Sequence, residues 1–216
     1  MAKSPRTRPE LKPLKVSCDH ADCEQGLHCF RESKKLAKKY GQHESGACQH
    51  CGTKLVDWER VKNRDPADTA HTFDALKNEW IRHWYWHLDF DPWARNYAIR
   101  KGRSGLREAA AKRIRSAVGK AKHPREGQQT GWDKNPLFYA QHATACCCRR
   151  CIQYWHGVPE GRPLTEEQVA YFTDLCLRYI FERMPDLAEE GRYVPPIRKE
   201  DLMNEQDGDR KKGEIK

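Results

Sequence analysis

Apolar residues recur every three or four positions in several stretches of the chain, the spacing that places them on one face of a helix. The stretch TFDALKNEWIRHWYWHLDFDPW predicts one helix that ends at or just before Pro92, because proline blocks a continuing helix. Its apolar positions are Phe73, Leu76, Trp80, Trp84 and His87 or Leu88. A further helix is predicted over most of residues 93–119, where Gly102 and Gly105 are candidates to break it in two.

The last apolar stripe follows a helix-start signal, in which Thr165 and Gln168 have the spacing of a capping box. The stripe consists of Val169, Phe172, Leu175, Cys176, Tyr179 and Ile180. Pro185 closes this helix. Alternation of apolar and polar residues, the mark of a strand, does not extend beyond a few positions outside the N-terminal part. The pattern therefore predicts a mainly α protein.

Charge and cysteine content narrow the class of protein. The 216 residues carry a formal net charge of +9, which favours a polyanionic partner such as nucleic acid. The first residues hold no apolar core of a secretion signal, and no apolar run approaches the roughly 18 residues that span a bilayer. We therefore expect a cytoplasmic protein without a membrane partner. In a reducing compartment its ten cysteines favour metal ligands over disulfides, and no organic cofactor is expected.

Five of the cysteines lie among residues 17–56 in polar sequence. Cys48 and Cys51 form a C-x2-C pair followed by glycine, a spacing that lets both thiolates reach one zinc ion. The expected ligands are Cys18, Cys23, Cys48 and Cys51, with Cys29 as the alternate and His20 and His28 as weaker candidates. Because few large apolar residues lie nearby, zinc binding would supply the folding free energy of this module.

Four more cysteines fall within six residues in HATACCCRRCIQYWH, which has a histidine at each end. Successive side chains on a helix turn by about 100°, so three consecutive cysteines cannot all face one ion. The expected ligands of a second zinc ion are His142, Cys147, Cys148, Cys151 and His156, with His142 and Cys147 competing for one position. An iron–sulfur cluster is the competing metal group, although the spacings match none of its common patterns. A catalytic thiol with His142 or His156 as its base is a further alternative.

Positive charge is concentrated between residues 94 and 125, where eleven lysines and arginines accompany a single acid, Glu108. A helix that merely faces solvent tends to mix charges of both signs, so this run favours contact with phosphates. No base-reading motif is present, and non-specific backbone contact is expected. The predicted nucleic-acid-binding residues are Arg100, Lys101, Arg103, Arg107, Lys112, Arg113 and Arg115.

A catalytic metal is an alternative at KNEWIRHWYWH. Glu79, His83 and His87 follow one another at four-residue intervals, so a single helix would place a carboxylate and two imidazoles on one face. The competing interpretation is a packed core with a surface pair of His83 and Glu79. His142 is a further catalytic candidate, because CCRRCIQYWH has the outline of the C-x2-C end of HNH-type nucleases. The Asp-His pair that such a site needs upstream is missing.

The run FYAQHATACCCRRCIQYWHGVPEGRPLT resembles a bacterial family of unknown function, number 4186, whose members carry a motif like AQHATATCCR-x-C-[LI]-x-x-WHGIPKGR-x-LT before a terminal helix. The resemblance covers about a quarter of the chain. It implies a bacterial or phage source and a compact, mainly helical domain, and it lends no activity. The matching positions include His142, Cys147, Cys148, Cys151 and His156. Cys146 stands where the family has threonine, which makes Cys146 the expected non-ligand.

Together these observations divide the chain into four parts. They are a flexible basic tail at 1–16, a zinc-ribbon-like module at 17–56, a helical zinc-containing main domain at 57–188 and a disordered charged tail at 189–216. The expected function is a protein with about two zinc ions that binds nucleic acid non-specifically in a regulatory, mobile-element or phage-related role. A metal-dependent nuclease or other hydrolase is one alternative. A zinc-stapled adaptor for a protein partner is another.

Overall fold

A computed structural model describes residues 17–197 and confirms the mainly α class, with eight α-helices and no β-strand among those residues. The elements are the 3-10 turn η1 (Cys23–Gln25), α1 (Lys34–Tyr40), α2 (Trp58–Lys62), η2 (Pro66–Asp68), α3 (Thr69–Lys77), α4 (Trp80–His87), α5 (Pro92–Ala117), α6 (Pro136–Ala143), α7 (Arg149–His156) and α8 (Glu166–Arg183). The predicted basic tail at 1–16 lies outside the described residues, as do residues 198–216 of the predicted charged tail.

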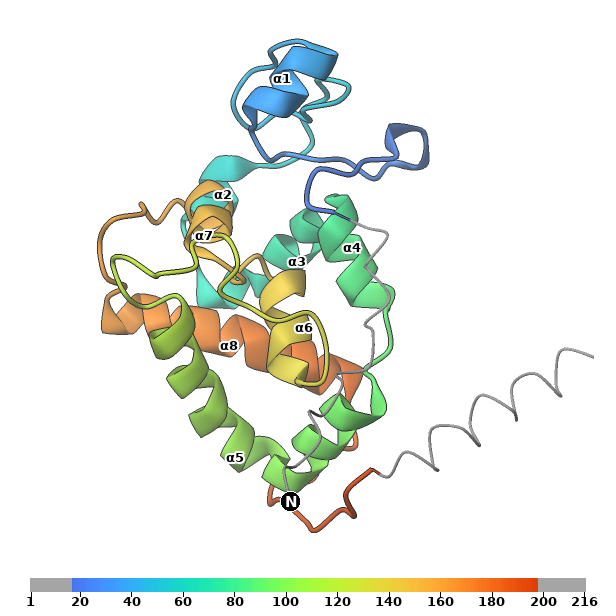
Figure 1. Ribbon diagram of the computed structural model, residues 1–216, viewed down its shortest axis with the longest axis vertical. Helices are drawn as coiled ribbons and strands as arrows, with labels where there is room; N and C mark the ends of the chain where they lie inside the picture. Colours follow the sequence, from blue (N-terminus) through green and yellow to red (C-terminus); the bar gives the residue numbers. More distant parts are fainter. Residues whose placement is uncertain (1–16, 198–216) are drawn as a thin grey trace, which may run out of the picture.

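The core forms around α8, which runs across the molecule with α5 and α6 packed against it (Figure 1). The helix α8 begins with the predicted capping box: Thr165 accepts the backbone N–H of Gln168, and the Gln168 side chain accepts the N–H of Thr165. Its apolar stripe is buried, and Phe172, Leu175 and Ile180 are fully covered. The helix α4 in turn packs on α6, so the central helices form one continuous apolar interior.

The single helix predicted up to Pro92 is interrupted, and α3 and α4 are separate helices. The break lies at Asn78 and Glu79, because the N-terminal segment pairs with the chain there. The backbone N–H of His28 donates to the carbonyl of Asn78 at 2.8 Å, and the N–H of Trp80 donates to the carbonyl of His28 at 2.9 Å. Glu79 thereby takes an extended conformation and turns its side chain inward.

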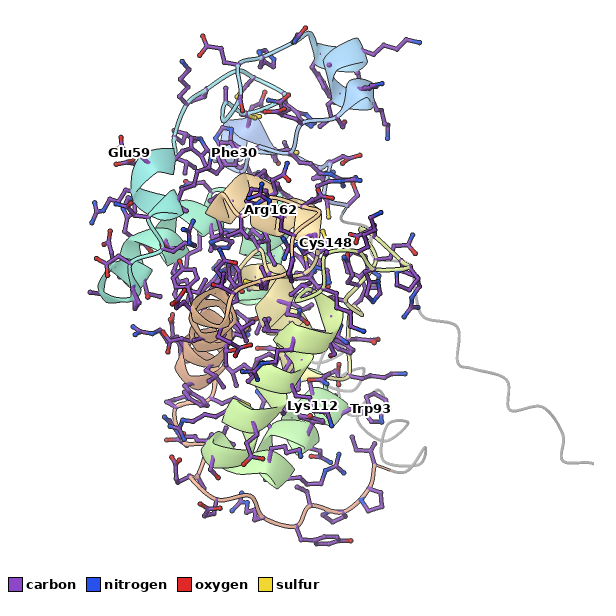
Figure 2. All side chains as sticks on the ribbon, turned by 90° about the vertical axis from the view of Figure 1, so that its left-hand side faces the viewer. Phe30, Glu59, Trp93, Lys112, Cys148 and Arg162 are labelled. Atoms are coloured by element: carbon purple, nitrogen blue, oxygen red, sulfur yellow. The ribbon has the colours of Figure 1, made fainter. Side chains whose placement is uncertain are left out.

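The N-terminal module, residues 17–56, lies at one end of the long axis of the molecule, and the kinked α5 reaches the other end (Figure 1). Phe30 attaches this module to the main domain. Its ring meets Trp155 of α7 edge-on with centroids 5.9 Å apart, and it meets Trp58 of α2 at 5.7 Å. Figure 2 shows Phe30 at this junction, above α7. The aromatic contact and the pairing of His28 join the module to the helices along one edge.

The helix α5 is kinked at Gly102, which has φ 62° and ψ −179°, a conformation open in practice only to glycine. A C-terminal segment binds at this kink. The N–H groups of Arg103 and Ser104 donate to the carbonyls of Ala188 and Glu189 at 2.9 and 3.0 Å, and the N–H of Arg192 donates to Ile99. Residues 189–192 were predicted to begin a disordered tail. In the structure, backbone groups freed by the kink bind them: Ser104 donates to Glu189, and Arg192 donates to Ile99.

We expect Gly102→Ala to lower the free energy of unfolding by about 3 kcal/mol, because alanine resists this backbone conformation. Its Cβ would also meet the backbone of Glu190 and Gly191. Gly105→Ala is the matched control: this position is helical, a Cβ there meets only the flexible Lys101 side chain, and alanine favours the helix by up to about 1 kcal/mol. Urea unfolding followed by circular dichroism measures both. Equal stabilities of the two variants would contradict the role given to Gly102.

Candidate metal centres

Four side chains of the N-terminal module converge on one point. They are Cys23, His28, Cys48 and Cys51, and one ligand atom from each lies within 4.8 Å of the others. The sulfurs of Cys23 and Cys48 are 3.8 Å apart, and the Cys51 sulfur is 3.5 Å from Nδ1 of His28. Three thiols and one imidazole at such distances can surround a single tetrahedral metal ion. We call this group the N-terminal cluster.

Two tight turns bring these ligands together. The first runs from Cys23 to His28 and is closed by the bridge between Asp22 and Leu27, with Gly26 at φ 73°. In the second, the carbonyl of Cys48 accepts the N–H of Gly52, which has φ 76°. Left-handed glycines permit the sharp reversals that let ligands from both turns approach one ion.

The structure groups His28, and not the predicted Cys18, with Cys23, Cys48 and Cys51. The turn at residues 22–27 and the pairing of the His28 backbone with α3 and α4 aim its ring at Cys51. The alternate, Cys29, points the other way, and its thiol donates to the carbonyl oxygen of Cys18 at 3.3 Å. The sequence contained the signal for His28 in its spacing from Cys23. Cysteines were ranked above histidines as ligands, and His28 was therefore placed among the weaker candidates.

Ionisation within the N-terminal cluster is uneven. Burial opposes ionisation of Cys51, but hydrogen bonds with Thr53, Cys23 and Cys48 outweigh burial and lower the pKa of this thiol to about 6. Burial and the hydrogen bond to Cys51 raise the pKa of Cys23 to about 12. One thiolate is therefore present near neutral pH, and a bound cation would draw the remaining protons from the other thiols.

A second group of thiols lies inside the helical domain. Cys147, Cys148 and Cys151 are all buried, and their sulfurs lie within 4.8 Å of one another. Cys148 caps the N-terminus of α7, where its sulfur accepts the N–H of Cys151 at 3.5 Å. The hydroxyl of Thr130 donates to the carbonyl of Cys147 at 2.7 Å and fixes the turn before α7. We call this group the central cluster.

A buried arginine contacts the central cluster directly. Arg82 donates to the sulfur of Cys151 at 3.2 Å, to the sulfur of Cys147 at 3.7 Å and to the carbonyl of His142 at 2.7 Å. Hydrogen bonds from Cys147 and Cys148 outweigh burial and, with the charge of Arg82, hold the pKa of Cys151 well below its usual value. These contacts favour the thiolate form of Cys151, the form that binds metal.

The counter-ion of Arg82 is Glu79, whose carboxylate lies 2.9 Å from Nε of the arginine. Each of the two side chains is only 1% exposed. The indole of Trp155 donates to Glu79 at 2.8 Å, and the hydroxyl of Tyr154 also donates to it. A charged pair so deeply buried is costly unless every polar atom is satisfied, and here α7 supplies the missing donors.

The histidines predicted as ligands of the central site lie outside the cluster. His142 stacks between Tyr85 and Trp132 at centroid distances of 4.7 and 4.5 Å, and its Nε2 bonds the carbonyl of Gly131. His156 bonds the carbonyl of Thr144 through Nε2 and packs on Phe172. Burial lowers the pKa of His142 to about 3 and that of His156 to about 4, so both are neutral rings of the aromatic core.

Cys146 also lies outside the cluster, and its buried thiol donates to the carbonyl of Thr144 at 3.3 Å. The alternative catalytic set of Glu79, His83 and His87 is not assembled. Glu79 faces the buried Arg82, while His83 and His87 stack on each other with centroids 4.0 Å apart at the surface. The interruption before α4 removes Glu79 from the helical face on which the prediction depended.

A pocket of about 590 Å³ opens beside the central cluster. Its wall combines the three clustered thiols and Cys18 with His142, Trp132 and Phe138 and with Arg31, Arg113, Arg125 and Arg150. Arg31 pairs with Asp19 at 3.2 Å, and Arg113 donates to the carbonyl of Gln129 at 2.6 Å. Arg125 and Arg150 are exposed, and within the described chain no hydrogen bond or ion pair engages their side chains.

The predicted basic surface of α5 is largely used within the fold. Arg103 donates to the carbonyls of Leu187 and Pro185, Arg107 pairs with Glu189, and Arg115 pairs with Glu166. Arg113 belongs to the pocket wall described above. The exposed remainder of the predicted set consists of Arg100, Lys101 and Lys112, of which Figure 2 shows Lys112 on α5, below Cys148. Sequence could not show this, because the acids and carbonyls that engage Arg103, Arg107 and Arg115 lie more than fifty positions away along the chain.

The arrangement defines a mainly helical protein with two clusters of soft ligands that could bind metal. The chain belongs to the family described as Domain of unknown function (DUF4186), whose model matches residues 70–181. The match contains the central cluster and its contact with Arg82, whereas the N-terminal cluster precedes it. No solved structure matches the chain. In the described part of the chain, no helix is both long and apolar enough to cross a membrane.

We expect Arg82→Met to lower the free energy of unfolding by about 3 to 5 kcal/mol, because it leaves the Glu79 carboxylate buried without its counter-ion. Arg178→Met is the control: Arg178 pairs with Asp174 at 2.6 Å on the surface of α8, and such pairs contribute at most about 1 kcal/mol. Denaturant unfolding of the purified variants measures the difference. A loss for Arg82→Met no larger than that of the control would contradict the central place of this ion pair.

Proposed function

We propose that this protein binds two zinc ions and uses the arginine-lined pocket beside the central cluster to hold the phosphates of nucleic acid. The observation that carries the proposal is the pocket itself. It sets four arginines around a group of buried thiols, and the side chains of two of them, Arg125 and Arg150, have no partner among residues 17–197. Arginine in such a setting favours phosphate, because its planar guanidinium matches two phosphate oxygens at once.

The ligand chemistry supports zinc. Three cysteines and one histidine form a common set for a structural zinc ion, and thiolates discriminate against hard cations such as magnesium. At the central cluster, the guanidinium of Arg82 donates to the sulfurs of Cys147 and Cys151, and a positive charge so placed favours the thiolate forms that bind zinc. The cysteine spacings around the central cluster match none of the common iron–sulfur patterns, which favours zinc over an iron–sulfur cluster.

Nucleic acid is favoured over other anions by the combination of charge and aromatic surface. Trp132 is 45% exposed at the pocket, and its ring lies parallel to that of His142, with an interplanar angle of 8°. Such a supported aromatic face can stack a base while nearby arginines hold the adjoining phosphates. The exposed cations of α5 would extend this surface without reading sequence.

The structure weakens the nuclease alternative more than the adaptor alternative. The catalytic sets on which the nuclease hypothesis rested are separated, since His83 and His87 lie at the surface and Glu79 is buried with Arg82. The adaptor hypothesis needs no site beyond the metal clusters, and a protein that binds zinc but not nucleic acid would favour it.

The first prediction concerns metal content, measured by mass spectrometry on protein purified under reducing conditions. We expect about two zinc ions per chain, because each cluster supplies at least three soft ligands. Cys51→Ser and Cys148→Ser should each remove about one ion by breaking different clusters. Cys29→Ser should retain both, since Cys29 lies outside the clusters. Iron accompanied by inorganic sulfide would refute the zinc assignment.

The second prediction concerns binding to a mixed-sequence oligonucleotide, followed by fluorescence anisotropy over a series of salt concentrations. The double variant Arg125→Gln/Arg150→Gln should bind more weakly, and the slope of log K against log salt should fall by between about 1 and 2, because each lost phosphate contact releases fewer counterions. The control, Lys35→Gln/Lys38→Gln on α1, removes the same charge from exposed positions that do not line the pocket. Equal losses in both variants would count against the pocket.

A further inference from the structure

One cysteine belongs to neither cluster and has no hydrogen bond to its sulfur among the described residues. Four thiols lie outside the clusters, those of Cys18, Cys29, Cys146 and Cys176. Cys29 and Cys146 donate to backbone carbonyls, and Cys176 contacts the hydroxyl of Thr144 at 3.7 Å. All three are buried, whereas Cys18 is half-buried, and its sulfur makes no hydrogen bond within the described residues.

The central cluster in turn supplies three ligands, although a structural zinc ion takes four. Cys18 lines the same pocket as Cys147, Cys148 and Cys151. Burial and then the charge of Cys151 raise the pKa of Cys18 to about 11, and Arg82 opposes this. The Cys18 thiol therefore lies in the electrostatic surroundings of the central cluster, not in those of the N-terminal cluster, where His28 completes the set.

We propose that Cys18 is the fourth ligand of the central metal site, together with Cys147, Cys148 and Cys151. The inference rests on metal binding as proposed above and is independent of nucleic-acid binding. On coordination, Cys18 loses its thiol proton to solvent and takes the position that water would otherwise fill. The metal would then join the first described residues of the chain to the N-terminus of α7.

Hydrogen bonds to the backbone of Cys18 and to Asp19 fix the segment from which Cys18 would bind the metal. Its carbonyl accepts the thiol of Cys29, and the neighbouring Asp19 accepts both Arg31 and, through its own carbonyl, the ring of His50 at 2.9 Å. The segment is thus fixed to the N-terminal module while the side chain of Cys18 faces the pocket. A metal ion bound by these four thiolates would connect the N-terminal module to the helical domain. Cys18 would then fill the coordination position that the central cluster leaves open.

The rival fourth ligand is His142, which lines the same pocket and has a buried Nδ1 without a hydrogen-bond partner. Its Nε2 is held by Gly131, and its ring is clamped between Tyr85 and Trp132, so reaching the metal would require breaking both stacks. The Cys18 sulfur has no competing hydrogen-bond partner within residues 17–197. The experiment must nevertheless separate thiolate, imidazole and water at the fourth position.

The test is cadmium-113 NMR of the full chain loaded with cadmium, because the chemical shift of this ion falls when a thiolate is replaced by nitrogen or oxygen. We expect two resonances, one for a site of three sulfurs and one nitrogen and one for a site of four sulfurs. Cys18→Ser should move the second resonance upfield and leave the first unchanged. Cys29→Ser and His142→Ala should move neither. A Cys18→Ser spectrum identical to wild type, or a shift in His142→Ala, would overturn the inference while leaving metal binding intact.

A wild-type measurement covers the case in which Cys18→Ser fails to fold. Alkylation of the zinc-loaded protein, mapped by mass spectrometry, should leave Cys18 and Cys148 unmodified, and removal of zinc with a chelator should make both reactive. Equal alkylation of Cys18 before and after chelation, with Cys148 newly reactive, would overturn the inference. Absence of metal from the wild-type protein would overturn both this inference and the proposed function.

Discussion

The buried ion pair between Glu79 and Arg82 is the constraint on which the remaining structure depends. Arg82 reaches the thiols of the central cluster and the carbonyl that ends α6, while Glu79 accepts donors from α7. Removing either charge would strand the other in an apolar interior. The pair therefore fixes the relation of α4, α6 and α7, and with it the position of the ligands.

The same pair links the two clusters. His28, a member of the N-terminal cluster, forms its backbone bridge at Glu79, and the carboxylate of Glu79 then holds the arginine that contacts Cys151. The path from one cluster to the other consists of a backbone pairing, an ion pair and a hydrogen bond to sulfur. The ion pair between Glu79 and Arg82 thus stabilises both the thiolate form of Cys151 and the position of His28.

The sequence predicted features that depend on local spacing. The capping box and apolar stripe of α8 follow from positions within one helix, and the pairs Cys48–Cys51 and Cys148–Cys151 follow from spacing within single turns. Features decided by distant partners were missed. The break before α4 depends on His28, about fifty positions earlier. Spacing also does not reveal that His142 is stacked on Tyr85 or that His156 packs edge-on against Phe172.

The C-terminal segment at the kink of α5 has a consequence for how the family is studied. The family match ends at residue 181, yet Arg103 and Arg107 find their partners at Pro185, Leu187 and Glu189. A fragment cut at the family boundary would free Arg103 from its two carbonyl acceptors and Arg107 from the negative charge of Glu189. Such a fragment would bind polyanions more readily than the intact protein, so nucleic-acid affinities measured on the isolated family region would be artificially high.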